Sequence, residues 1–127
     1  MNITELKAYF EKTSGLAVLS TCDSTGNVNA AVYGKPHFIE GDVFALIMND
    51  RVSHANLQTN PRAAYLFLEE GSKSKGIRIY LKKKGETDNP AEIDKFRKHH
   101  GKDGTAAEKK LFLVKFTVEK TREIIEK

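Results

Sequence analysis

The sequence predicts a single α+β domain over residues 1–127, mainly β, with six or seven antiparallel strands in a small barrel and helices only at its edges. A chain of 127 residues is close to the commonest domain size and can form one core. Hydrophobic residues make up 39% and charged residues 30%, as in globular proteins. The apolar runs have strand length and are joined mostly by short turns, which favours antiparallel hairpins over a parallel α/β sheet. Closing such strands into a barrel removes exposed edges.

Composition excludes several classes of protein. No apolar run approaches the ~20 residues that a membrane helix needs. The first turns carry Glu5 and Lys7 within a helical pattern, so we do not expect a signal peptide. The single cysteine, Cys22, excludes an internal disulfide framework and argues against a zinc cluster. We therefore expect a reducing, cytoplasmic location.

The first part of the chain is expected to form one helix followed by two hairpins. Ile3, Leu6 and Phe10 recur at the spacing of one helical face. The next apolar run, LAVLSTC, is expected to be buried on both faces, and the segment DSTGN after it is dense in turn formers. Gly41 and Asp42 form a two-residue connection with glycine first, as a type II′ turn prefers. The expected elements are a helix at Asn2–Thr13 and strands at Leu16–Cys22, Val28–Tyr33, His37–Glu40 and Val43–Met48.

The rest of the chain is expected to add two helices, three strands and a final helical turn. Asn49 and Asp50 offer capping side chains to a short helix that Pro61 closes. Residues 77–82 alternate between apolar and polar, and Pro90 suits the first turn of a later helix. The expected elements are a helix at Arg51–Thr59, strands at Arg62–Leu68, Ile77–Leu81 and Leu111–Val118, a helix from Asn89 to Gly101 with Ile93, Phe96 and His100 on one face, a loop at Lys102–Ala107 and a helical turn at Thr121–Glu126.

Two alanines in the second expected strand are the first candidate for a ligand site. Ala30 and Ala31 stand where large β-forming residues would be expected for packing alone. Small side chains there would let a flat ligand lie close against the strand. They would equally relieve crowding in a barrel wall, and this segment alone favours neither interpretation.

The second candidate is the strand-to-helix segment Met48–Leu57. A helix that begins after a strand has free backbone N–H groups and a partial positive charge at its start, which suits a phosphate. Arg51 can offer a bidentate guanidinium, Ser53 a hydroxyl and His54 a ring N–H. The alternative is an ordinary capped surface helix in which Arg51 pairs with Asp50 or Glu69. Asp50 also competes with an anion for the same N–H groups.

The order of these segments resembles the pyridoxamine 5′-phosphate oxidase-like, FMN-binding split-barrel family. The likeness extends from about Leu16 to Leu81, and no single motif in it is specific. The resemblance implies a six- to seven-stranded antiparallel split β-barrel of Greek-key type with peripheral helices. It also implies a homodimer that binds FMN in two clefts at its interface. The residues that carry the likeness are Thr25–Tyr33, Asp50–Leu57 and Asn60–Leu66.

The same resemblance assigns the cofactor-binding residues but no catalytic ones. Many members have Lys where this chain has Ser53, and a Ser-x-x-His-like arrangement near Asn-Leu occurs in relatives associated with haem handling. No metal site is expected, because His99 and His100 lack carboxylate or cysteine partners at ligand spacing. The implied set is Asn29, Ala30, Ala31, Val32, Ile47, Met48 and Asn49 along the isoalloxazine ring, and Arg51, Ser53, His54 and Asn56 at the phosphate.

Three functions follow as hypotheses. The first is a flavin-dependent oxidoreductase that transfers electrons or hydride between a reduced nucleotide or other donor and a small acceptor. The second is a non-enzymatic module that binds haem, a deazaflavin or pyridoxal phosphate in the same cleft. The third is a nucleic-acid or acidic-partner binder, because residues 65–127 carry 16 Lys and Arg against 11 Asp and Glu. Hydrolase chemistry has no support, since no nucleophile–base–acid series is present.

Overall fold

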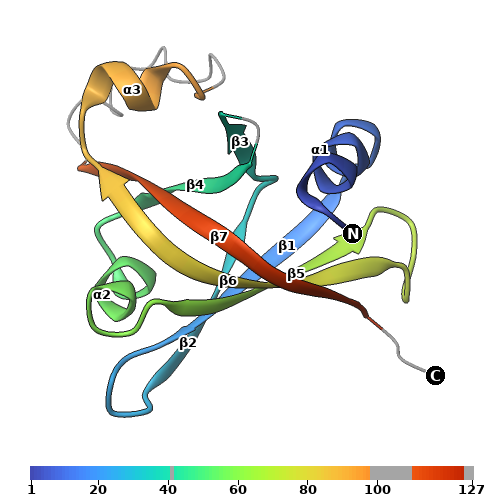
Figure 1. Cartoon of the computed structure of the whole chain (residues 1–127). Coiled ribbons are helices and arrows are strands. Elements are labelled where there is room, and N and C mark those ends of the chain that lie inside the picture. The colour runs from blue at the N-terminus through green and yellow to red at the C-terminus, as the bar shows by residue number, and fades with distance from the viewer. Residues whose placement is uncertain (41, 98–109, 125–127) are drawn as a thin grey trace.

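The computed structural model describes residues 1–40, 42–97 and 110–124, in which seven strands form one antiparallel sheet with three helices at its periphery (Figure 1). The predicted mainly-β, antiparallel architecture is confirmed. The order of strands across the sheet is β2-β1-β5-β6-β7-β4-β3. The strands are β1 (Gly15–Cys22), β2 (Val28–Tyr33), β3 (His37–Ile39), β4 (Val43–Asn49), β5 (Arg62–Glu69), β6 (Gly76–Thr87) and β7 (Leu111–Glu123), and the helices are α1 (Ile3–Lys12), α2 (Val52–Thr59) and α3 (Pro90–Asp94).

Local hairpins and long-range pairings together build the sheet. The hairpin neighbours are β1 with β2, β3 with β4 and β5 with β6. The long-range pairings join β1 to β5 and β4 to β7. Because α2 connects β4 to β5, these pairings bring it against β1 and β2 as well as β4. The fold thus sets the start of α2 beside β2, from which it is separated by the β3–β4 hairpin in the sequence.

The β1–β2 turn is fixed by its own side chains. Asp23 Oδ1 accepts hydrogen bonds from the backbone N–H groups of Thr25 and Asn27, each at 2.9 Å. Hydrogen bonds from Asn27 and Thr25 hold the pKa of Asp23 well below its usual range. The backbone N–H of Ser24 donates to Thr59 Oγ1 at 3.2 Å. The turn is therefore tied to the last residue of α2.

The core lies between the sheet and α1. Leu6 is fully buried and Phe10 is 3% exposed, so the apolar face of α1 is covered as its spacing predicts. The Phe10 ring meets Phe67 edge-on, with centroids 4.9 Å apart. Tyr65 is also fully buried, and its hydroxyl donates to the carbonyl of Gly34 at 2.7 Å. Burial raises the pKa of Tyr65, so the hydroxyl stays a hydrogen-bond donor at neutral pH.

The strand β1 is buried on one face only. Ala17, Leu19 and Thr21 face the core, whereas Leu16 is 55% exposed and Ser20 is exposed. The prediction that this run is buried on both faces is wrong, because the main core and Asn56 of α2 contact only the side of β1 that carries Ala17, Leu19 and Thr21.

The two long C-terminal strands extend further than predicted. The predicted helical turn at Thr121–Glu126 is wrong in its described part, because β7 continues to Glu123 and pairs there with Ile77 of β6. β6 itself runs to Thr87, well past the predicted end at Leu81, with irregular register near Lys83. Each strand supplies the hydrogen-bonding partner that keeps the other extended.

The predicted helix after Asn89 is shorter in its described part. α3 ends at Asp94, and Ile93 packs with Ala45 and Leu113 in a second, smaller apolar cluster. The predicted end of this helix, including His99, His100 and Gly101, and the predicted loop at Lys102–Ala107 lie outside the described residues. Gly41 of the expected type II′ turn also lies outside the described residues. The neighbouring Glu40 has a φ of 54°.

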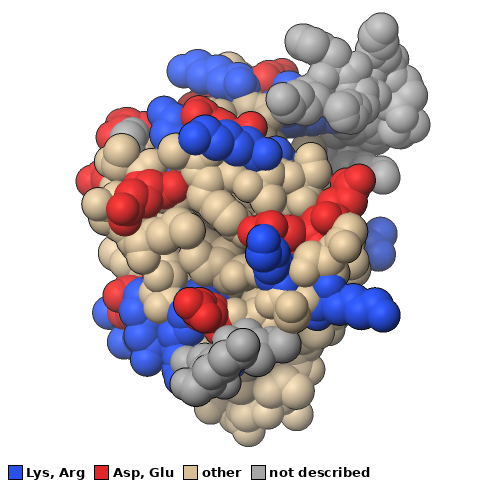
Figure 2. All heavy atoms as spheres, turned by 90° about the vertical axis from the view of Figure 1, so that its right-hand side faces the viewer, with Lys and Arg blue, Asp and Glu red and all other residues tan. Residues whose placement is uncertain are grey.

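Charged residues of both signs are distributed over the surface. In the view of Figure 2, Lys and Arg side chains lie next to Asp and Glu side chains around a mostly uncharged area. Several are paired, as in Lys115 with Glu92 at 3.7 Å and Arg97 with Asp94 at 3.6 Å. None of the helices in the described part of the chain has the length and hydrophobicity needed to span a membrane.

Candidate functional site

The helix α2 begins without a side-chain cap. Arg51 is the N-cap residue, and its side chain makes no hydrogen bond to the first turn. The predicted capping by Asn49 and Asp50 is wrong: Asp50 Oδ1 instead lies 3.3 Å from His54 Nδ1. Arg51 is exposed and forms no ion pair within the described residues, so the pairing with Asp50 or Glu69 that the alternative interpretation requires is absent there. Within the described residues, therefore, no side chain caps this turn and no carboxylate pairs with Arg51.

Ser53 joins the first turn of α2 to β2. Its hydroxyl accepts a hydrogen bond from Asn29 Nδ2 at 3.3 Å, and the residue is 4% exposed. Burial raises the pKa of Tyr33, and a hydrogen bond with Ser53 partly offsets this effect. One turn later, Asn56 Nδ2 donates to Thr21 Oγ1 of β1 at 3.0 Å, with both residues buried. These polar contacts fix the orientation of α2 on the sheet.

His54 lies at the centre of a charged network. The residue is 7% exposed, and its ring stacks on Phe112 of β7 with centroids 3.7 Å apart and planes 13° from parallel. Its Nε2 lies 2.9 Å from Glu86 Oε2, while Lys83 Nζ donates to Glu86 Oε1 at 2.7 Å. Burial raises the pKa of Glu86, but hydrogen bonds from Lys83, His54 and Gln58 outweigh it and lower the pKa to about 2.

The residues predicted along a flavin ring fall into two groups. On β2, Ala30 is exposed, Ala31 is half-buried and Val32 is 67% exposed. On β4, Met48 is 2% exposed with its side chain in the main core. Ile47 packs in the second cluster beside α3, and Asn49 is exposed. A ligand beside the end of β4 would therefore meet the side chain of Asn49 and only the backbone of the other two.

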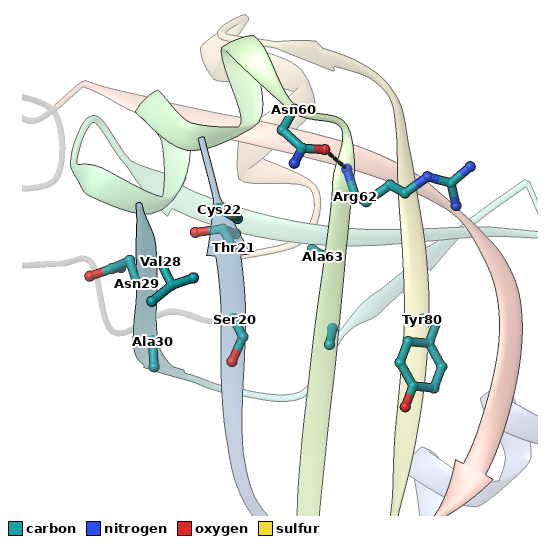
Figure 3. Close-up of a pocket in the computed structure, with 11 residues that line it drawn as sticks. Ser20, Thr21, Cys22, Val28, Asn29, Ala30, Asn60, Arg62, Ala63 and Tyr80 are labelled. Carbon is teal, nitrogen blue, oxygen red and sulfur yellow. Dashed lines mark hydrogen bonds between the residues drawn. The ribbon is translucent and has the colours of Figure 1, made fainter. Parts of the chain in front are cut away.

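A shallow cavity of about 580 Å³ lies on the outer side of β1, β2, β5 and β6 (Figure 3). Strand register explains it: Ala30, Ser20 and Ala64 are consecutive partners across three strands, and their small side chains leave a hollow bounded by Tyr80. Only Asn29 and Ala30 of the predicted site contribute to it. The lining residues are Ser20, Thr21, Cys22, Val28, Asn29, Ala30, Asn60, Arg62, Ala63, Ala64 and Tyr80.

Sequence reasoning missed two parts of this region. The cavity could be predicted only by knowing that Ser20 pairs with Ala64, and this pairing joins two strands that are far apart in the chain. The only local signal is a small residue near the middle of each of three strands. Glu86 was missed because β6 was expected to end at Leu81. No group of three or more potential metal ligands occurs among residues 1–40, 42–97 and 110–124.

Comparison with known proteins identifies the fold. No protein-family model matches the chain, and no curated protein matches it by sequence. The structure is similar to an FMN-binding protein from Syntrophomonas wolfei, with a TM-score of 0.75 and 22% identity over 98% of this chain and 88% of the other. It is also similar to HutZ, the haem storage protein from Vibrio cholerae, with a TM-score of 0.70 and 15% identity over 97% of this chain and 95% of the other.

A third similar structure is a putative pyridoxamine 5′-phosphate oxidase from Lactobacillus delbrueckii, with a TM-score of 0.65 and 12% identity over 94% of this chain and 92% of the other. Each similarity extends over nearly the whole chain at low sequence identity. The chain therefore has the split-barrel fold of the pyridoxamine 5′-phosphate oxidase-like proteins, as its sequence predicts.

Proposed function

We propose that this protein is a single-domain, cytoplasmic flavoprotein that binds FMN at the start of α2. The observation that carries this proposal is that, within the described part of the chain, the first turn of α2 has no side-chain cap and the adjacent guanidinium of Arg51 has no ion-pair partner. A phosphate accepts hydrogen bonds from such N–H groups and forms a bidentate pair with arginine. The residues present therefore fit the phosphate of FMN. Ser53 would add a hydroxyl, and Asn56 would hold the helix in place through Thr21.

The ring of the flavin would lie along Asn29–Val32 and Asn49. The small side chains of Ala30 and Ala31 leave room for a flat molecule next to the backbone. Asn29 and Asn49 carry amide groups that can hydrogen-bond the polar edge of the ring. The backbone of Ile47 and Met48 would complete this side of the site, because their side chains face the interior.

We propose that the activity is transfer of electrons or hydride between a reduced nucleotide or another donor and a small acceptor. A bound flavin supplies this redox chemistry, and the protein supplies binding, orientation and electrostatics. The described residues around the proposed site contain no nucleophile with a matched base. This arrangement suits a reaction that needs the two reactants to be stacked and shielded from water.

A homodimer is part of the proposal, and the outer face of β1, β2 and β5 supports it. Val28 is 81% exposed, Val32 67%, Leu16 55% and Leu66 39%. Val32, Val18 and Leu66 are register partners, so these side chains form one apolar surface. Exposed apolar patches of this kind mark interaction surfaces. A second copy of the chain would cover this apolar surface and would close the neighbouring cavity.

The test of flavin binding is the absorption spectrum of the purified protein with mass identification of what it releases. We expect a yellow protein that releases FMN on denaturation. Colourless protein that does not quench added FMN fluorescence would contradict the proposal. Sedimentation should give a dimer, and Val32→Glu should convert it to a monomer, whereas Lys7→Glu, on the exposed side of α1, should leave the dimer intact.

A binding module without enzymatic activity is the second candidate. The similarity to the haem storage protein over 97% of this chain favours it. Titration with haem, a deazaflavin, pyridoxal phosphate and FMN separately, recorded by visible absorption, distinguishes the candidates. Saturable haem binding together with no flavin binding would replace the first proposal with the second.

Nucleic-acid binding is a weaker candidate. The interleaved acidic and basic side chains in Figure 2 give no continuous basic surface on that side of the molecule. Ion pairs such as Arg62 with Glu119 and Lys115 with Glu92 also neutralise part of the positive charge. The test is binding of an oligonucleotide at low salt, which should be absent; binding that weakens steeply with added salt would revive this function.

A further inference from the structure

The outer face of the sheet changes character from β2 to β7. Every second residue of a strand lies on this face, so the register of the strands defines rows of side chains that cross the sheet. One row passes through three small residues, an aromatic residue and a lysine: Ala30, Ser20, Ala64, Tyr80 and Lys120. The adjacent row passes through three apolar residues and two arginines: Val32, Val18, Leu66, Arg78 and Arg122. In both rows the uncharged side chains lie on β2, β1 and β5, and the cations lie on β6 or β7.

The cationic half of this face contains like charges in opposite positions. Arg62 of β5 lies opposite Lys82 of β6, and Arg78 of β6 lies opposite Arg122 of β7. Like charges that face each other directly across an antiparallel pair destabilise a sheet. Glu119 offsets part of this charge through its ion pair with Arg62. The Arg78 guanidinium donates to backbone carbonyls near the end of β7, and these contacts leave its charge in place. An anion bound here would lower the repulsion between these cations.

The outer cavity lies beside this cationic half. Its volume of about 580 Å³ is within the range of small-molecule sites. Neighbouring strands are ~4.8 Å apart, so the three small side chains of the first row leave a floor roughly 10 Å wide, enough for a planar ring. Figure 3 shows Ala30 and Tyr80 at opposite ends of this floor, with Ser20 between them. Lys120 Nζ lies 5.1 Å from the centroid of the Tyr80 ring, so the aromatic end of the cavity is also its cationic end.

The cavity adjoins the site proposed for the flavin. Asn29 and Ala30 line the cavity, and both belong to the strand segment along which the flavin ring is proposed to lie. Asn29 Nδ2 also donates to Ser53 Oγ at 3.3 Å, which joins this strand to the start of α2. A reactant in the cavity would therefore lie next to the flavin, as a reaction between two bound molecules requires.

We propose that the outer cavity binds a planar, anionic reactant of the nucleotide class, with its ring over Ala30, Ser20 and Ala64 and its phosphate groups at Lys82 and Lys120. Tyr80 offers an aromatic surface to the ring, and lysine ammonium groups pair with phosphate oxygens. The change from small to cationic side chains along the row sets the orientation of the ligand. This inference rests on the proposed function for the role of the ligand as a reactant, whereas the site itself follows from strand register.

The test is the affinity of the full chain for NADP⁺, measured by isothermal titration calorimetry. The oxidised nucleotide does not reduce a bound flavin, so binding is measured without a reaction. Ala64→Leu should fill the floor of the cavity and weaken binding at least about tenfold, the scale of forcing extra methylene groups into an occupied site. The double variant Lys82→Gln and Lys120→Gln should weaken binding about five- to thirtyfold, as expected for two exposed charge pairs. Added salt should weaken NADP⁺ binding in the wild type and have a smaller effect on the double variant.

Matched changes on α1 are the controls. Ala8→Leu and Lys7→Gln, both at exposed positions, should leave NADP⁺ affinity unchanged, and circular dichroism checks that each variant is folded. Absence of NADP⁺ binding in the wild type, or unchanged affinity in both Ala64→Leu and the double lysine variant, would overturn this site even if FMN binds. NADP⁺ binding that both changes weaken, in protein that binds no FMN, would support the site and overturn the proposed function.

Discussion

The helices α1 and α2 both pack against the barrel, yet they bury opposite kinds of side chain. α1 buries Leu6 and Phe10, whereas three of the four buried residues of α2 are Ser53, His54 and Asn56. Buried polar groups are retained where they are hydrogen-bonded, and each of these three has a partner on a strand.

Their termini differ in the same way. Asn2 and Glu5 form a capping box at the start of α1, and Lys35 Nζ donates to the carbonyls of Phe10 and Thr13 at its end. The start of α2 has no side-chain cap. α1 thus has hydrogen-bonded groups at both ends and a buried apolar face, and it stabilises the fold. α2 is held by directional polar contacts, and no side chain among the described residues caps its first turn, as the proposed binding role requires.

Removal of the central apolar side chain of α1 should have the largest effect on stability. Phe10→Ala should lower the free energy of unfolding by about 3 to 5 kcal/mol, because it deletes a buried aromatic ring and leaves a cavity. Urea denaturation followed by circular dichroism measures this. Lys7→Ala on the exposed side of α1 is the control and should change stability by less than about 0.5 kcal/mol. A loss below about 1 kcal/mol for Phe10→Ala would contradict the assignment of α1 to the core.

Removal of the guanidinium at the start of α2 should change ligand affinity and leave stability nearly unchanged. Arg51→Gln should weaken FMN binding about 10- to 100-fold, the size of a charge-assisted hydrogen bond. Riboflavin affinity should stay within about twofold, since Arg51 is proposed to contact the phosphate. Arg62→Gln is the matched control, because Arg62 lines the outer cavity. A large loss of FMN affinity in Arg62→Gln, with none in Arg51→Gln, would indicate that the ligand binds in that cavity and not at α2.

The carboxylate that holds His54 should make stability depend on pH. The folded-state pKa of Glu86 is lowered from 4.5 to about 2, so its contribution is complete above about pH 4.5 and is lost as the pH falls toward 2. Glu86→Gln should cost about 1 to 2 kcal/mol at pH 7, allowing for partial exposure. The difference from the wild type should vanish near pH 2. Denaturation curves at several pH values measure it, and a constant difference would argue against an ionic role.

The capping box of α1 should contribute the smallest of these effects. Asn2→Ala removes the acceptor for the Glu5 N–H and should cost about 1 kcal/mol. Thermal unfolding measures the loss, which should leave FMN affinity unchanged. A matched exchange sharpens the contrast between the helices: Arg51→Ser would provide α2 with a cap and should reduce FMN affinity while stabilising the helix. An equal loss of FMN affinity in Asn2→Ala would remove the functional distinction between them.

Local patterns in the sequence predicted most elements but few of their partners. The turn formers at 23–27 and the helix before Asn60 needed only neighbouring residues to be recognised. The end of β6 could not be predicted, since Lys83 is the middle one of three consecutive lysines that read as a solvated strand end, and Glu86 follows them. These residues stay extended because β7 pairs with them from more than 25 positions away. The exposed outer face of β1 was missed for the same reason: an apolar run does not reveal which of its faces another segment covers.

The sequence by itself determined the class of fold, the position of α2 after β4 and the small residues of β2, because periodicity, turn chemistry and residue size act over a few neighbouring residues. Only the tertiary structure decided that Asp50 contacts His54 instead of capping α2. It also decided that Glu86 holds the other ring nitrogen, and that Ala30, Ser20 and Ala64 together form a hollow. The last two of these outcomes depend on strand register, since a shift of one residue turns each side chain to the opposite face. The long-range pairing of β1 with β5 and of β6 with β7 sets that register.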